Sequence, residues 1–541
     1  MKNIIKFIVI LCCASSTLLS GCIDETLPTQ VATDNQLAAS DKATEALLWA
    51  MPAYTNKFDC LGRGDALLHF DFGYGSIMHI RDVMTQEFLS VAHNYDQYTR
   101  WAGNQAMGED YAYAQFVWTF YWKFIQTTNN MIAVIDAETA TDVQLGYLGA
   151  GYAFRSLAYL DAAQMFEFLE NDKTSSTNVA GNNVLNLTVP IVDETITEQE
   201  ARNNPRATRE AMKEFILSDL NKAEQYIQKL TRPNKTLPDL AAVYGLKARL
   251  YMWIGEYGNA KTYARKAIDA SNSTPLSKDQ WHDTTTGFND LSTSSWMWGS
   301  KMQKEDDVVQ SGIVNWTAWA ANEAKYGYVG AGPFIVIDKS FYDKISNEDF
   351  RKLSYIAPEG HPLDGKSIFI DPTWAKDNMP VLASTKFRPN AANTDDPLIG
   401  SASAYPMMRV EEMYFIEAEA AAHSNVAEGI QLINNFMQTY RYRNYNCTAT
   451  TPEDVVDEIF FQKRVEFWGE GISYFDYKRL DKPVIRGYAD SNHPATRRFN
   501  TSRRPAWMNF CIVANEKNNN AALLGFENPD PSQLYSAWTG K

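Results

Sequence analysis

The chain has 541 residues, of which 45% are hydrophobic, so it can build a large apolar core. A single compact core stops growing at about 250–300 residues, which leads us to expect either two domains or a repeat architecture. The net charge of −15, from 65 acidic and 50 basic side chains, disfavours a phosphate-binding surface and therefore nucleic acid as a partner.

The first 22 residues have the pattern of a lipoprotein signal. Two lysines precede a short apolar run at residues 7–14, and Leu19-Ser20-Gly21-Cys22 follows it. Such a run is too short to span a bilayer as a mature helix, which favours a cleaved signal peptide over residues 1–21. The last four residues match the bacterial lipobox, so we expect cleavage before Cys22 and acylation of its thiol. An ordinary secretory signal with a chance cysteine is the alternative.

The rest of the chain offers few signals of processing. Residues 22–40 are polar and aperiodic, which suits a tether, and no later window approaches the length of a membrane span. Cys60, Cys447 and Cys511 are odd in number and lack the spacing of a metal site or a disulfide framework, so we expect buried free thiols.

Helical periodicity dominates the first half of the chain. Apolar residues recur at helical spacing in three segments, at residues 116–131, at 148–166 and from about 207 to 227. Residues 239–270 add a helix, a turn at Gly255–Gly258 and a second helix. Their small and aromatic residues have the tetratricopeptide spacing, which predicts two antiparallel helices packed closely through a set of alanines: Ala248, Ala260, Ala264 and Ala267.

The helical signal fades between about residues 275 and 404. Gly, Pro, Asn and Asp interrupt this stretch, and its many aromatic residues argue against disorder. A loop-rich segment of this size inside a compact protein is usually functional. We expect helices to resume at Tyr405, with further helices at 427–440 and 452–469 and an irregular tail after Gly487.

Three segments resemble one known family. Residues 405–420, YPMMRVEEMYFIEAEA, are similar to the P-x-x-R-x-x-E-x-x-L-x-x-A-E-A helix of SusD/RagB-type outer-membrane lipoproteins. Residues 464–479, RVEFWGEGISYFDYKR, resemble the R-x-x-E-L-x-x-E-G-x-R-x-x-D-L-x-R signature, and residues 242–251 resemble the A-x-x-x-L-K-A-R-x-Y helix. Two positions depart from the pattern, Gln462 where glutamate is common and Ser473 where arginine is usual, which puts local ion pairs in question.

The resemblance implies both a fold and a function. Its fold would be all-α, a tetratricopeptide-like scaffold over residues 41–275 with a RagB/SusD C-terminal half over 276–541. Family members bind glycans at the bacterial surface and cap a SusC-like, TonB-dependent transporter. They have no catalytic activity and need no organic cofactor. The protein would therefore be lipid-anchored at the outer membrane and face the cell exterior.

Clustered carboxylates raise the question of an enzyme. Glu466 and Glu470 lie one helical turn apart, close to Asp476, and paired carboxylates about 5–10 Å apart serve glycoside hydrolases. Neighbouring Lys463 and Arg464 make a charge-paired helix end the stronger interpretation. The seven histidines lack metal-ligand spacing, and there is neither a G-x-S-x-G elbow nor a phosphate-binding glycine loop, so we expect no catalytic and no metal site.

Candidate ligand-binding residues fall in two segments. In several members of that family, a tryptophan followed three residues later by asparagine contributes stacking and a hydrogen bond to sugar, and Trp101 and Asn104 match that spacing. We expect Trp101 to be exposed in a loop, with Arg81 and Asp82 adding polar contacts. The loop-rich segment supplies three aromatic pairs that would form flat platforms or pack as core: Trp296 and Trp298, Trp316 and Trp319, Tyr326 and Tyr328.

Three functions therefore remain open at the level of sequence. The leading hypothesis is a surface lipoprotein that delivers an oligosaccharide to a transporter. The alternatives are an extracellular glycoside hydrolase and a helical-repeat lipoprotein that binds peptides or proteins.

Overall fold

The computed structural model describes residues 41–540. The signal peptide, Cys22 and the tether lie outside the described residues, so those expectations stay predictions. Within residues 41–540, no helix is both long and apolar enough to cross a membrane.

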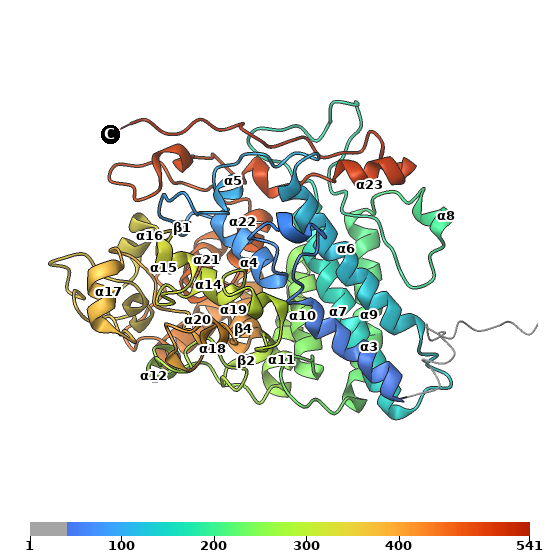
Figure 1. Cartoon of the computed structure of the whole chain (residues 1–541), viewed down its shortest axis with the longest axis horizontal. Coiled ribbons are helices and arrows are strands. Elements are labelled where there is room, and N and C mark those ends of the chain that lie inside the picture. The colour runs from blue at the N-terminus through green and yellow to red at the C-terminus, as the bar shows by residue number, and fades with distance from the viewer. Residues whose placement is uncertain (1–40, 541) are drawn as a thin grey trace, which may run out of the picture.

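A stack of long helices forms one side of the molecule (Figure 1). Helix α3 packs on α6 and α7, α7 on α9, α9 on α10, α10 on α11, α11 on α19, and α19 on α20 and α21. Each helix therefore covers the apolar face of its neighbours, as a repeat architecture requires. The bounds are α3 (Asp41–Tyr54), α6 (Ala112–Ala133), α7 (Asp142–Phe166), α9 (Arg209–Tyr226), α10 (Leu240–Ile254), α11 (Tyr257–Ala270), α19 (Val410–Ala422), α20 (Val426–Tyr440) and α21 (Pro452–Glu466).

The predicted repeat unit is confirmed as helices α10 and α11. Asp239 caps α10, its Oδ1 accepting from the Ala242 N–H at 3.0 Å, and the helix ends at Gly255 in the left-handed conformation, φ +78°. The four predicted alanines are all 0% exposed, so they form the close contact. Lys247, at a position that usually holds leucine, is buried too, with its ammonium bonded to Asn221 and Glu224 of α9.

Two small antiparallel sheets connect distant parts of the chain. Strand β1 (Phe88–Ser90) pairs with β3 (Ile335–Ile337), and β2 (Trp296–Lys301) pairs with β4 (Ala404–Arg409). The prediction of a helix starting at Tyr405 was wrong by five residues, because α19 begins only at Val410. Every residue of β4 is buried. A continuous buried run has no polar face to distinguish a strand from a helix.

The loop-rich character of the middle segment is confirmed. Apart from the strands, it contains 3₁₀ turns and α-helices of at most seven residues: α12 (Lys278–Trp281), α13 (Asp307–Gln310), α14 (Trp316–Ala320), α15 (Tyr328–Ala331), α16 (Lys339–Lys344), α17 (Pro372–Asn378) and α18 (Pro397–Gly400). The remaining α-helices are α4 (Tyr74–Val83), α5 (Thr99–Ala102), α8 (Glu198–Ala201), α22 (Ser473–Arg479) and α23 (Ala514–Asn519).

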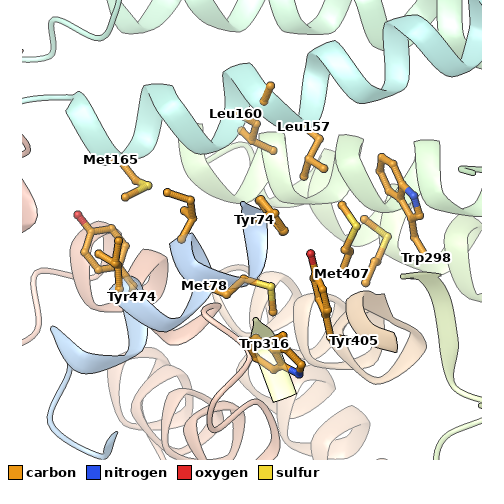
Figure 2. Close-up of a cluster of buried hydrophobic side chains, with 14 of the residues drawn as sticks. Tyr74, Met78, Leu157, Leu160, Met165, Trp298, Trp316, Tyr405, Met407 and Tyr474 are labelled. Atoms are coloured by element: carbon orange, nitrogen blue, oxygen red, sulfur yellow. The ribbon is translucent and has the colours of Figure 1, made fainter. Parts of the chain in front are cut away.

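The core lies where the helical stack meets this loop-rich part. Figure 2 shows Leu157 and Leu160 of α7 above Tyr74 of α4, with Trp316 and Tyr405 below. Helices α19 and α20 come late in the chain but extend the stack begun by α3 to α11. The division into residues 41–275 and 276–541 therefore stays a prediction.

Candidate functional site

Five aromatic side chains from separate segments form one connected group, which we call the aromatic cluster: Phe70, Tyr98, Trp101, Trp319 and Tyr328. Trp319 stacks on Tyr328, with ring centroids 4.2 Å apart and an angle of 12°. Tyr98 contacts Trp319 edge-on at 4.9 Å and Trp101 at 5.7 Å. The structure thus joins two segments that the sequence singled out separately, residues 98–104 and 316–328.

Buried polar contacts position the segment that carries Tyr98. The Tyr98 hydroxyl lies 2.8 Å from the Ser76 hydroxyl of α4, and its N–H donates to Asp96 at 2.9 Å. Asp96 is ion-paired with Arg497 at 2.8 Å. Charged groups held this way in the interior keep neighbouring backbone in one place.

Arg486 connects the ends of α4 and α5. Its guanidinium donates to the carbonyl of Ala102 at 2.7 Å and to those of Val83 and Thr85 at 2.9 and 2.7 Å. These carbonyls lie at or just after the ends of the helices, where no N–H group of the same helix is available to bond them. The C-terminal tail, which carries Arg486, therefore holds the aromatic cluster in position.

The aromatic cluster reaches the surface through further rings, which we call the aromatic rim: His69, His93, Tyr95 and Tyr113. The Tyr328 hydroxyl and His69 Nδ1 are hydrogen-bonded, and burial lowers the pKa of His69, which keeps its ring neutral at pH 7. Tyr113 is half-buried and contacts Phe70 at 5.3 Å and Trp101 at 5.0 Å.

The two most exposed members of the rim follow β1. Tyr95 is 57% exposed, and its ring lies 5.5 Å from that of His93 at an angle of 30°. His93 lies against Gly332, directly after α15, and a side chain at that glycine would collide with the imidazole. The glycine thus allows His93 to approach the helix that begins with Tyr328.

The expectation that Trp101 is exposed was wrong. Its side chain is only 1% exposed, because Phe70, Tyr98 and Tyr113 enclose the ring. Asn104 is buried as well, at φ +50°, and its amide donates to the carbonyl of Pro531 at 2.9 Å. Asn104 therefore anchors the C-terminal tail, and a ligand role for either residue stays untested.

Arg81 and Asp82 also lie in the interior. Arg81 pairs with Asp161 at 3.2 Å, and Asp82 accepts from the Gly471 N–H at 2.9 Å. Burial raises the pKa of Asp82 well above its ordinary value. The expectation of polar contacts to a surface ligand from these two residues overlooked that all of α4 is buried.

The three aromatic pairs of the middle segment separate in the structure. Trp296 and Trp298 are fully buried in β2, with Trp298 against Phe154 of α7, and Trp316 packs on Phe387 and Tyr405. These three rings belong to the core. Trp319 and Tyr328 join the aromatic cluster, while Tyr326 is half-buried with its hydroxyl near Ser401 at 3.4 Å.

The carboxylates of the C-terminal signature form a buried ion-pair network. Glu466 bonds to Arg441 at 2.6 Å, Arg351 at 2.9 Å and Arg409 at 3.1 Å. Burial opposes its ionisation, but the three guanidinium groups outweigh that cost and hold the pKa of Glu466 well below its ordinary value.

The other two carboxylates are paired in the same way. Glu470 bonds to Lys386 at 2.6 Å and to Arg409 at 2.9 Å, and Asp476 bonds to Lys463 at 2.6 Å. All three carboxylates are buried in ion pairs, as expected. The expected partners were wrong for two of them, because Glu466 and Glu470 pair with residues from distant segments, while Lys463 pairs with Asp476 and Arg464 with Glu87.

The two departures from the family signature have local consequences. The amide oxygen of Gln462 accepts a hydrogen bond from the Arg351 guanidinium at 2.6 Å. Glutamine therefore keeps a hydrogen bond to this arginine without the negative charge that glutamate would add. The Ser473 hydroxyl is buried with no hydrogen-bond partner in the part of the chain that the structure describes.

The sequence also leads us to expect free cysteines and no metal site. Cys60, Cys447 and Cys511 are buried free thiols, as expected. Among residues 41–540, no group of three or more His, Cys, Asp or Glu side chains has an arrangement that would hold a metal ion.

Comparisons with known proteins give one family-model match and several similar folds. Residues 375–524 match the model of the SusD family. A SusD-like carbohydrate binding protein from Bacteroides vulgatus ATCC 8482 superposes with a TM-score of 0.70 at 20% identity, over 89% of this chain and 97% of its own.

Two further solved structures are similar. A SusD superfamily protein from Bacteroides thetaiotaomicron VPI-5482 has a TM-score of 0.66 at 18% identity, over 91% of this chain and 100% of its own. A SusD-like carbohydrate binding protein from Bacteroides fragilis NCTC 9343 has a TM-score of 0.64 at 13% identity, over 90% and 99%. None of the curated proteins compared matches the chain.

The chain has the mostly helical SusD-like fold, and its C-terminal part, residues 375–524, matches the SusD family model. At these identities the structures carry the fold alone, so ligand and partner require a separate argument.

Proposed function

We propose that the protein binds an oligosaccharide at its aromatic rim and delivers it to a SusC-like, TonB-dependent transporter from a lipid anchor at the outer membrane. The observation that carries the proposal is the rim itself. His93 and Tyr95 are exposed, His69 and Tyr113 are partly exposed, and these last two pack on the buried aromatic cluster. Two of the similar solved structures are SusD-like carbohydrate binding proteins, which supports it.

The physics of stacking explains why such a rim suits sugars. The C–H face of a pyranose is apolar, and covering it with a ring removes apolar surface from water, which contributes on the order of 1–3 kcal/mol per contact. The surrounding hydroxyls need hydrogen-bonding groups, and His69, His93 and the tyrosines supply them. Rigid aromatic rings make these contacts at low entropic cost.

The proposal is for a binding protein without catalysis. The carboxylates that invited comparison with a hydrolase are buried and bonded to arginine or lysine. A general acid must reach the glycosidic oxygen, which groups in this network do not. Release from the membrane surface to the transporter would need no chemical step.

The test is a glycan array followed by calorimetric titration of each hit, using the full-length chain purified in detergent. Tyr95→Ala should weaken binding of a hit roughly tenfold, since each 1.4 kcal/mol is a factor of ten. The matched control is Phe526→Ala, which removes another exposed ring, 37% exposed, from a distant segment. It should bind like the wild type.

Two outcomes would favour the alternatives. New reducing ends after incubation with oligosaccharides would indicate a glycoside hydrolase. Binding of unmodified peptides in place of every glycan would indicate a peptide-binding repeat protein. If Tyr95→Ala and the wild type bind a glycan with equal affinity, the glycan does not bind at the aromatic rim.

A further inference from the structure

A second surface feature lies away from the aromatic rim. It is a groove of about 790 Å³ lined by residues 275–278, by Asn347, Glu348, Phe350, Leu353, Leu363 and Lys366, and by residues 438–444. We call it the α20 groove, because the end of α20 forms one wall and the start of α12 another. Figure 1 shows α12 and α20 toward the lower edge of the molecule and α5 and β1 toward the upper edge. The groove and the rim share no residue.

Basic side chains dominate the charge of the α20 groove. Lys278, Lys366 and Arg443 are exposed, and among the described residues none of the three has a carboxylate partner. One exposed carboxylate also lines the groove, that of Glu348, which accepts from the amide of Asn444 at 2.8 Å, so the exposed basic groups outnumber it three to one. Asp279, next in sequence to Lys278, is not among the lining residues.

This concentration of cations stands out against the net charge of the chain. The chain has fifteen more acidic than basic residues, so its net charge repels anions. Three unpaired cations around one concavity reverse the field locally, and field lines concentrate where the walls are of low dielectric. Like charges that line one groove also repel, a cost that a bound anion would reduce.

The base of the groove is rigid. Arg441 is buried beneath it, donating to the carbonyls of Leu276 at 3.0 Å and Tyr440 at 2.8 Å while its other nitrogens bond Glu466. Its charge is therefore compensated from inside the protein. The bonds fix the 275–278 segment against the end of α20, so the groove exists before any ligand arrives.

Aromatic and aliphatic surface completes the lining. Tyr440 and Tyr442 are half-buried, and Leu353 contributes an apolar patch. Burial raises the pKa of Tyr442 to about 12, so its hydroxyl stays a protonated donor at neutral pH. Flat rings beside cations fit a ligand that has apolar faces and negative charges together.

We propose that the α20 groove binds an anionic oligosaccharide, one whose sugar rings carry carboxylate or sulfate groups. The inference deepens the proposed function, because it assigns an acidic class of glycan to a second site on the same protein. Lys278, Lys366 and Arg443 pair with the acidic groups, while Tyr440 and Tyr442 contact the faces of the sugar rings. Exposed pairs of this kind are individually weak, so three acting together with the rings set the affinity.

The experiment compares acidic probes with a neutral one on the full-length protein in detergent. The probes are tetragalacturonate, a chondroitin sulfate hexasaccharide and fully methyl-esterified tetragalacturonate, each titrated calorimetrically. At least one acidic probe should bind, with an affinity that falls as ionic strength rises. In the triple variant Lys278→Gln/Lys366→Gln/Arg443→Gln that affinity should fall roughly tenfold or more, and binding of the ester should not change.

A matched triple variant controls for net charge. Lys42→Gln/Lys304→Gln/Lys376→Gln removes three other exposed cations, which also lack ion pairs in the described chain, and should bind the acids like the wild type. Failure of both acidic probes to bind, or equal affinity of wild type and the groove variant, would overturn the proposal. So would equal losses in the two triple variants, or binding of tetraglutamate as tight as that of the acidic sugars.

The rim variant separates this inference from the proposed function. Binding of the acidic probe in the groove should survive Tyr95→Ala. Loss of that binding in Tyr95→Ala but not in the groove variant would place the acid at the rim and leave the proposed function standing. If no glycan binds, neutral or acidic, both this inference and the proposed function are wrong.

Discussion

The ring of Trp101 is enclosed by Phe70, Tyr98 and Tyr113, so Trp101→Ala removes a core side chain. Truncating a buried tryptophan costs about 3–5 kcal/mol, because it loses apolar burial and leaves a cavity. We expect a lowered melting temperature for this variant. Tyr95→Ala, at an exposed ring of the aromatic rim, should melt like the wild type. Equal melting of Trp101→Ala and wild type would contradict the buried position.

Asp338 gives a residue-scale prediction of pH dependence. Burial alone would raise its pKa, but hydrogen bonds from His493, Tyr488 and Ser340 outweigh it and lower the pKa to about 2. A carboxyl with a depressed folded-state pKa adds stability above its unfolded pKa of about 3.9, and that stability is lost as pH falls toward 2. The contribution is about 2 kcal/mol.

The measurement is urea unfolding at a series of pH values from 5 downward. The free energy of unfolding should fall less steeply with decreasing pH in Asp338→Asn than in the wild type, since asparagine has no proton to take up. Parallel slopes for the two proteins would show that Asp338 is not the group responsible.

At the scale of elements, α10 and α11 approach closely because alanines line their contact. Ala260→Leu inserts a larger side chain where the native residue is 0% exposed, and overpacking of this kind costs about 1–3 kcal/mol. Ala270→Leu, at the exposed end of the same helix, is the control. Denaturant unfolding should separate the two variants. Equal stability would mean that the helices have room to move apart.

The same elements show what the sequence could predict. The alanine and tyrosine spacing at residues 239–270 reports contacts within one helix pair, and such local packing leaves a periodic pattern. Strand β4 left none, because both of its faces are buried. Its pairing with β2 depends on a segment more than a hundred residues earlier, which no local pattern records.

The candidate site was predicted less well for a related reason. Residue type and spacing singled out Trp101, but its exposure depends on Phe70 and Tyr113 from other segments. His69 and His93 belong to no metal-ligand pattern, and Tyr95 and Tyr113 belong to no motif in the sequence. Nothing in the sequence around them indicates that α15 and Gly332 bring them together. Long-range packing decides which aromatic residues face solvent.

At the scale of the whole molecule, the long helices and the loop-rich part share one core, while both candidate binding surfaces lie on loops and helix ends. Rigid elements can therefore hold the rim and the α20 groove while their side chains vary between relatives. Two sites on one rigid body would also raise the effective concentration of a long glycan at the second site once the first is occupied.

The last prediction concerns how the whole molecule is held at the membrane. None of the helices in residues 41–540 could span a bilayer, and the lipobox motif predicts lipid on Cys22, which lies outside the described residues. Several acyl chains on one residue hold a protein far more firmly than one chain does. Cys22→Ala should therefore move the protein from the membrane fraction to the soluble fraction and abolish labelling by palmitate. Cys447→Ala, which alters a buried free thiol, should leave both unchanged. Continued membrane association of Cys22→Ala, together with an unlabelled wild type, would show that the chain is held by something other than this lipid.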